Sequence, residues 1–161
     1  MTTRPEGPPV GLDRAADVTL HASRALLAVI ARSLNEALDE VSLPQYRVLV
    51  LLATEGPLRS GVVAERMGIH PSTFTRNADR LVAGGWVQRI DEPGTRLTVL
   101  IELTDAGRDL VDRVTARRRE EIAAILAGMA DDERATLADA LEAFTRAAGG
   151  PAPGELSALG M

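Results

Sequence analysis

The turn between two short helices constrains the fold of this chain most strongly. The first helix, predicted over 59–67, is followed by Gly68, the residue type best able to adopt the left-handed conformation of a C-terminal cap. The second begins with Pro71 at a favoured first helical position and ends before Gly84 and Gly85. Two helices joined by a short, glycine-containing turn are typical of a helix-turn-helix.

The second of these helices, predicted over 70–83, has two chemically different faces. Phe74, Ala78 and Leu81 predict an apolar side that packs against the preceding helix. On the opposite side lie five polar residues suited to a major groove: Ser72, Thr73, Arg76, Asn77 and Arg80. Arginine pairs with guanine, asparagine pairs with adenine, and hydroxyls reach bases or phosphates. An ordinary solvated helix surface has the same composition, so this face alone does not decide between the two interpretations.

The start of that helix is a candidate phosphate site, because its first backbone N–H groups have no partner inside the helix. We therefore expect His70 and Pro71 to lie at the DNA backbone. Arg59 and Ser60, at the start of the preceding helix, are further candidate DNA contacts.

The rest of the chain predicts a mainly α fold with a small β-hairpin. Apolar spacing and helix-breaking residues predict four more helices, over 13–41, 44–53, 104–127 and 131–148. Thr104 is the predicted cap of the third, with Gly107 an unfavourable residue in its first turn, and Asp131 or Asp132 is the predicted cap of the last. Segments 86–90 and 97–103 are rich in β-branched residues and flank a turn-forming hexapeptide, which is typical of a hairpin.

Two arginines of the hairpin are candidate DNA contacts. Arg96, next to Thr95 at the tip, would be placed to enter the minor groove, and the alternative is a solvent-exposed turn arginine. Arg89, near the base, either contacts phosphate or pairs with Asp91.

Charge is segregated along the chain, whose net charge is −5. Segment 58–97 carries six arginines against four acidic residues, so this middle part is basic and the remainder is acidic. A chain that binds nucleic acid over its whole surface is therefore excluded, and any DNA face has to be local.

Several other classes of protein are disfavoured. The chain has no cysteine, and its two histidines, His21 and His70, lie in different predicted elements, so neither a catalytic triad nor a metal site can be assembled. We expect no cofactor and no enzymatic activity. No apolar run is long enough to span a membrane, so a cytoplasmic location without membrane contact is expected.

Three segments resemble the MarR (multiple antibiotic resistance regulator) family of bacterial transcription factors. They are Leu43-Pro44-Gln45-Tyr46-Arg47-Val48-Leu49, Val63-Ala64-Glu65-Arg66-Met67-Gly68 and Leu103-Thr104-Asp105-Ala106-Gly107-Arg108. The resemblance implies a single domain over 13–148, with dimerisation helices in 13–42 and 104–148 and a winged helix-turn-helix in 44–103. Flexible tails are expected over 1–12 and 149–161.

The wing departs from the family pattern. Members usually carry an Asp-x-Arg motif there, often followed by a second arginine, whereas this chain has Gly94, Thr95, Arg96 and Leu97. Arg96 keeps the minor-groove position, but the residue that would brace it is a glycine. The resemblance therefore implies wing contacts that are weaker or differently aimed.

What the resemblance implies for function is a homodimer that binds a double-stranded, near-palindromic operator, usually as a repressor. Similar proteins often release DNA when a small aromatic or phenolic effector binds. The polar candidates for such a pocket are His21, Arg24, Tyr46 and Arg47, each of which also has a simple structural explanation. The alternative function is a winged-helix module that binds another protein and lacks specific DNA binding.

Overall fold

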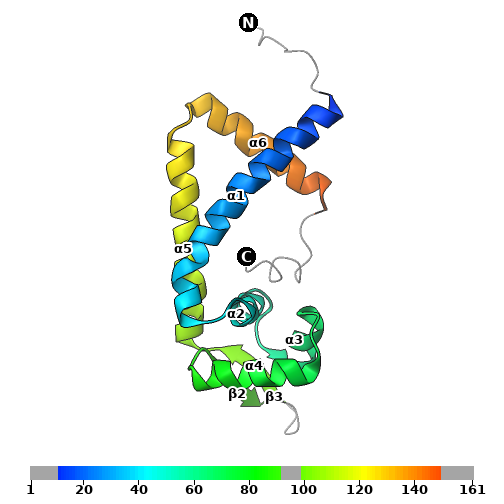
Figure 1. Cartoon of the computed structure of the whole chain (residues 1–161), viewed down its shortest axis with the longest axis vertical. Coiled ribbons are helices and arrows are strands. Elements are labelled where there is room, and N and C mark those ends of the chain that lie inside the picture. The colour runs from blue at the N-terminus through cyan, green and yellow to red at the C-terminus, as the bar shows by residue number, and fades with distance from the viewer. Residues whose placement is uncertain (1–10, 92–98, 150–161) are drawn as a thin grey trace, which may run out of the picture.

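In the computed structural model, a helical arm stands on a lobe built around a small sheet (Figure 1). The structure describes residues 11–91 and 99–149. The elements are α1 (Leu12–Glu40), α2 (Leu43–Glu55), β1 (Leu58–Arg59), α3 (Ser60–Arg66), α4 (Pro71–Ala83), β2 (Val87–Asp91), β3 (Val99–Leu103), α5 (Asp105–Ala127) and α6 (Asp131–Ala147). We call α1, α5 and α6 the helical arm, and the elements from α2 to β3 the sheet lobe. This order confirms the predicted mainly α, winged-helix fold class.

The sheet has three antiparallel strands in the order β1-β3-β2. β2 and β3 form the predicted hairpin, in which Val87 lies opposite Leu103. β1 was not predicted from the sequence. It consists of Leu58 and Arg59, and a strand of two residues has no alternating pattern to detect. It forms because the chain leaving α2 runs alongside β3.

The core of the sheet lobe is built largely by α2, which packs against α5 and β3. Its apolar run 48–52 is buried along its whole length because other elements surround it. The largest fully buried side chains of the lobe are Tyr46, Leu49, Leu51, Leu52, Phe74, Leu81 and Ile101. The lobe therefore closes around its own apolar residues.

The junction between β3 and α5 explains a glycine that the sequence made look unfavourable. Thr104 caps α5 as predicted, since its Oγ1 accepts a hydrogen bond from the Gly107 N–H at 3.1 Å. The same hydroxyl donates to the carbonyl oxygen of Gly85 at 2.6 Å. A Cβ at Gly107 would lie 2.1 Å from the carbonyl oxygen of Trp86. Gly107 thus lets α5 pass close to the backbone of Trp86, just before β2, which the sequence-based expectation missed.

The predicted cap of α6 at Asp131 or Asp132 is wrong. The N-cap is Ala130, whose N–H donates to the carboxylate of Glu133 at 2.9 Å. Asp131 and Asp132 lie instead in the first turn of the helix. Negative charge is stabilised there by the helix dipole, and the Glu133 carboxylate satisfies the backbone N–H of Ala130.

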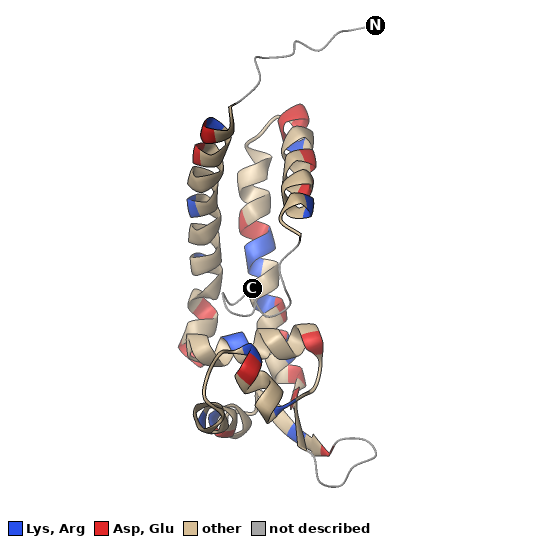
Figure 2. Cartoon of the chain, turned by 90° about the vertical axis from the view of Figure 1, so that its right-hand side faces the viewer, with Lys and Arg blue, Asp and Glu red and all other residues tan. Residues whose placement is uncertain are grey.

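The helical arm is joined along its length by ion pairs between α1 and α5. Arg32 pairs with Glu121 at 2.8 Å, and Arg113 pairs with Glu40 at 2.8 Å. Figure 2 shows α1 and α6 standing on opposite sides of α5 at the end away from the sheet. α6 buries none of its residues within the chain. Among the described helices, none is both long and apolar enough to cross a membrane.

Candidate nucleic-acid interface

The turn between α3 and α4 fixes the direction in which α4 leaves the lobe. Gly68 adopts a positive φ of 64°, as predicted for a C-terminal cap, and the N–H of Ile69 donates to the carbonyl of Ala64 at 3.0 Å. His70 is the N-cap of α4, and its Nδ1 accepts from the Ser72 N–H at 3.3 Å. Pro71 follows at the first helical position. The start of α4 is thus held by its own side chains.

The structure gives α4 the two faces that the sequence predicts. Phe74, Ala78 and Leu81 are buried in the lobe. On the other side, Ser72, Thr73, Arg76 and Arg80 are exposed and Asn77 is half-buried. Arg76 and Arg80 form no ion pair with any residue that the structure describes. Their guanidinium groups are therefore available to an external acceptor.

One residue of this outward face was missed by the sequence reasoning. Asp79 lies three positions after Arg76 and seven after Ser72, so all three share one side of the helix. Its side chain is 58% exposed. The helical period by itself places Asp79 on this face, but the prediction of DNA contacts considered only arginine, hydroxyl and amide side chains.

Arg89 has a partner that neither sequence interpretation named. Its Nη2 donates to Oδ1 of Asp79 at 2.6 Å, which joins β2 to α4. The suggested pair with Asp91 is wrong, because the guanidinium is bound to a helix that lies 10 positions earlier in the chain. An ion pair between two different elements cannot be predicted from residues that are neighbours in the sequence.

The remaining predicted DNA contacts are divided between described and undescribed parts of the chain. Arg59 is exposed at the N-cap of α3, and Ser60, the first residue of that helix, is half-buried. Both therefore lie at a helix start, as predicted. Thr95 and Arg96, together with the departures from the family wing motif at Gly94 and Leu97, lie outside the described residues.

The four candidate effector residues come from two helices, His21 and Arg24 from α1 and Tyr46 and Arg47 from α2. Tyr46 is 1% exposed in the lobe core, and burial raises the pKa of its hydroxyl to about 12, while the positive charge of Arg118 acts in the opposite direction. His21 and Arg24 are exposed on α1, where His21 Nδ1 lies 2.8 Å from the carbonyl oxygen of Asp17. Arg47 is half-buried on α2.

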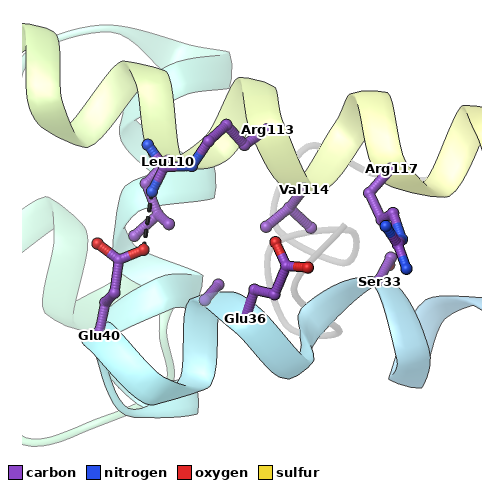
Figure 3. Close-up of a pocket in the computed structure, with 8 residues that line it drawn as sticks. Ser33, Glu36, Glu40, Leu110, Arg113, Val114 and Arg117 are labelled. Carbon is purple, nitrogen blue, oxygen red and sulfur yellow. Dashed lines mark hydrogen bonds and ion pairs between the residues drawn. The ribbon is translucent and has the colours of Figure 1, made fainter.

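A small cavity between α1 and α5 is too narrow for an effector. It has a volume of about 10 Å³, which is room for roughly one water molecule. Figure 3 shows that its polar lining comes from both helices, with the ion pair between Glu40 and Arg113 at one end and Ser33 and Arg117 at the other. The cavity is a packing gap beneath surface ion pairs.

A larger apolar cavity opens in the helical arm, between α1, α5 and α6. Its volume is about 350 Å³. The lining is almost wholly aliphatic and includes Leu26, Val29, Ile122, Leu126, Leu137 and Leu141. Large exposed apolar side chains lie on the same three helices, among them Leu27, Ile125 and Phe144. Apolar surface of this extent typically marks an interface with another protein.

No group of three or more metal-ligating side chains occurs within 11–91 and 99–149. The candidate site is the outward face of α4 with the neighbouring β2, because exposed arginine, hydroxyl, amide and carboxylate groups lie together there. Such groups bind nucleic acid through hydrogen bonds and charge.

Comparison with known proteins decides between the remaining interpretations. The model of the MarR family matches residues 40–96. An HTH-type transcriptional regulator of Mycobacterium bovis, Mb0904, is 33% identical over 102 residues, which are 63% of this chain and 71% of that protein. The crystal structure of RV1404 from Mycobacterium tuberculosis is 40% identical, with a TM-score of 0.79 over 90% of this chain and 99% of that one. The chain belongs to the MarR family.

The fold agrees with this membership. MarR of Escherichia coli, in its apo form, matches 85% of this chain and 98% of its own, with a TM-score of 0.55 and 22% identity. MarR-family regulators bind DNA and act as dimers. This family member is therefore a DNA-binding transcriptional regulator and not an enzyme, as the sequence predicted.

Proposed function

We propose that this MarR-family regulator binds a near-palindromic operator as a homodimer, with α4 of each subunit in the major groove. The observation that carries the proposal is the exposure of Arg76 and Arg80, without an ion pair among the described residues, on a helix whose other face is buried in the lobe. Arginine in this setting can pair with both acceptors of guanine. Segment 44–103 would then be the DNA-binding region.

We propose that the polar residues of α4 contact the bases and that a second group of residues binds the DNA backbone. Bases are read by Ser72, Thr73, Arg76, Asn77 and Arg80, and phosphates are bound at His70, Pro71, Arg59 and Ser60. The start of α4 supports the second role, because the dipole of a 13-residue helix favours a phosphate oxygen at its N-terminal end. Thr95 and Arg96 complete the proposal as the wing contact in the minor groove.

The dimer is proposed to form through the helical arm, in segments 13–42 and 104–148. The apolar cavity between α1, α5 and α6 and the exposed Phe144 are the support. α6 in particular has no buried residue in a single chain, although Leu137, Leu141 and Phe144 give it an apolar side. A second copy would cover that side, as the same patch on both subunits does in a two-fold dimer.

Two-fold symmetry fixes the expected form of the operator. The recognition helices of such a dimer contact half-sites about 10 bp apart, centre to centre. Repression by occupation of a promoter is the mode that we propose. In vitro transcription from a promoter carrying the operator should decrease as protein is added, and an increase would instead indicate activation.

The test of the α4 assignment is fluorescence anisotropy with a labelled duplex from the chain's own upstream intergenic region. Arg76→Ala should weaken specific binding about 5- to 150-fold, as expected for loss of one bidentate base contact. Arg14→Ala is the matched control, because this exposed arginine lies at the start of α1, at the far end of the molecule (Figure 1). Equal binding by both variants would remove α4 from the reading role.

The effector pocket stays a prediction. Tyr46 belongs to the core of the lobe, and none of the four candidate residues lines the apolar cavity of the arm. The alternative of a protein-binding module without DNA binding is disfavoured, since the family is one of DNA-binding regulators.

A further inference from the structure

The arginines near α4 differ in whether they form an ion pair with a described residue. Arg76 and Arg80 project from α4 and pair with no described residue, whereas Arg89 of β2 is held by Asp79 at 2.6 Å. The side chains of this pair are 45% and 58% exposed, so water and external ions reach both groups. Arg89 is therefore close to the outward face of α4 but already has an anionic partner.

The Asp79 carboxylate lies on the side of α4 that is proposed to face the DNA. It shares the exposed side of α4 with Ser72 and Arg76, because residues at i, i+4 and i+7 lie on one face of a helix. An isolated carboxylate on this side would repel the phosphates of a bound duplex. Arg89 neutralises that charge, and in doing so its own charge is no longer directed at phosphate.

We propose that Asp79 is a positioning residue that keeps Arg89 off the DNA backbone and so limits sequence-independent binding. The inference rests on the proposed function, in which α4 faces the DNA. The Asp79–Arg89 pair would then act on sequence-independent affinity: base contacts from α4 stay in place, while one potential phosphate contact is withheld from every duplex. Because phosphate contacts do not depend on sequence, withholding one lowers the affinity for every duplex by a similar factor.

The competition between Asp79 and phosphate for Arg89 is expected to be close. An exposed ion pair is held only weakly, since water and salt screen it. Loss of the carboxylate charge should therefore be enough to redirect the guanidinium. Each phosphate neutralised by an arginine makes the slope of log K against log salt steeper by about 0.9.

The experiment measures binding of the full-length protein to its operator and to an unrelated duplex of equal length, over a series of salt concentrations. For Asp79→Asn we expect a slope on the unrelated duplex that is steeper by about 0.9, and non-specific affinity about three- to tenfold higher at low salt. Operator affinity should rise by a similar factor, because the new phosphate contact does not depend on sequence. Asp79→Asn with Arg89→Gln should return the slope to the wild-type value, because the redirected arginine is absent.

Two control variants separate this effect from simpler ones. Asp91→Asn removes the same charge from an exposed residue at the end of β2 and should leave the slope unchanged. Asp79→Glu keeps a carboxylate for Arg89 and should behave as wild type. Thermal unfolding of each variant reports whether the fold is intact.

The outcomes distinguish the inference from the proposed function. A wild-type slope for Asp79→Asn, or a steeper slope that persists without Arg89, would overturn the inference. So would equal losses of operator and non-specific binding together with a lower Tm, because the pair would then be a structural brace. Failure of the wild-type protein to prefer its operator, or an unaffected Arg76→Ala variant, would instead overturn the proposed function.

Discussion

The two phenylalanines of the chain lie in opposite surroundings. Phe74, on α4, is fully buried in the sheet lobe, whereas Phe144, near the C-terminal end of α6 in the helical arm, is 58% exposed. The lobe encloses its apolar side chains with elements of the same subunit, and the arm leaves Leu27, Ile125 and Leu141 uncovered. The lobe is therefore complete as one subunit, whereas the arm needs a partner to bury its apolar surface.

The largest expected effect separates these two regions directly. Phe74→Ala should lower the free energy of unfolding by about 3 to 5 kcal/mol, because it opens a cavity in a closed core. Denaturation in urea, followed by circular dichroism at fixed protein concentration, measures the change.

Phe144→Ala is the matched variant in the arm. We expect an intact subunit fold and a lower dimer affinity, visible as dissociation at higher protein concentration in sedimentation velocity. If Phe144→Ala lost as much subunit stability as Phe74→Ala without dissociating, the distinction between a closed lobe and an open arm would be wrong.

The second prediction concerns the junction where the lobe meets the arm. Gly107→Ala should cost about 3 kcal/mol, because its Cβ would lie 2.1 Å from the backbone oxygen of Trp86. Gly61→Ala is the control, since a Cβ there meets nothing within 4 Å, and alanine should leave α3 unchanged or slightly more stable. Similar Tm values for the two variants would show that α5 moves away freely from β2.

The third prediction uses the buried hydroxyl of the lobe. The pKa of Tyr46 is raised to about 12, against about 10 in an unfolded chain, so the folded state holds this proton more tightly. The associated stability is fully present below pH 10 and is lost as the pH rises through 12, by about 2 to 3 kcal/mol.

The chain offers a direct measurement, because Tyr46 is its single tyrosine and tyrosinate absorbance reports on this residue alone. Tyr46→Phe should abolish both the absorbance change and this part of the alkaline destabilisation. An ordinary titration near pH 10 in the folded protein would show that the lobe core is open to water.

The smallest effect is expected at the cap of α5. Thr104→Ala should cost about 1 kcal/mol, because the N–H of Gly107 loses its acceptor and the carbonyl of Gly85 loses a donor. Thr54→Ala removes a hydroxyl that only bonds back to its own helix, and should change stability by less than about 0.5 kcal/mol. Equal effects would mean that the junction does not depend on its cap.

Much of the fold could be predicted because its signals are local. Pro71, Gly68 and the double glycine after Ala83 mark the ends of α3 and α4 within a few residues. The two faces of α4 follow from helical spacing alone. By contrast, β1 is too short to show an alternating pattern. Alanine is a disfavoured N-cap residue, so Ala130 could not be predicted as the cap of α6, although its N–H is bound by Glu133.

The apolar face of α1 shows what cannot be predicted from local sequence. Helical spacing places Leu27, Leu34 and Leu38 on one apolar face of α1. In the structure, Leu34 is only 6% exposed within its own chain, whereas Leu27 and Leu38 are 54% and 41% exposed. The periodicity indicates that a face is apolar, but it does not indicate whether α5 or a second subunit covers it.

The sequence by itself determined the order of the helices, the position of the helix-turn-helix and the chemical character of the outward face of α4, since each depends on neighbouring residues. Tertiary structure decided that Gly107 serves a close backbone approach and that Arg89 is bound to Asp79 rather than to Asp91. Both depend on atoms from different elements that meet only after the lobe has packed. The physical reason is that contact distance, unlike helical period, is set by the whole fold.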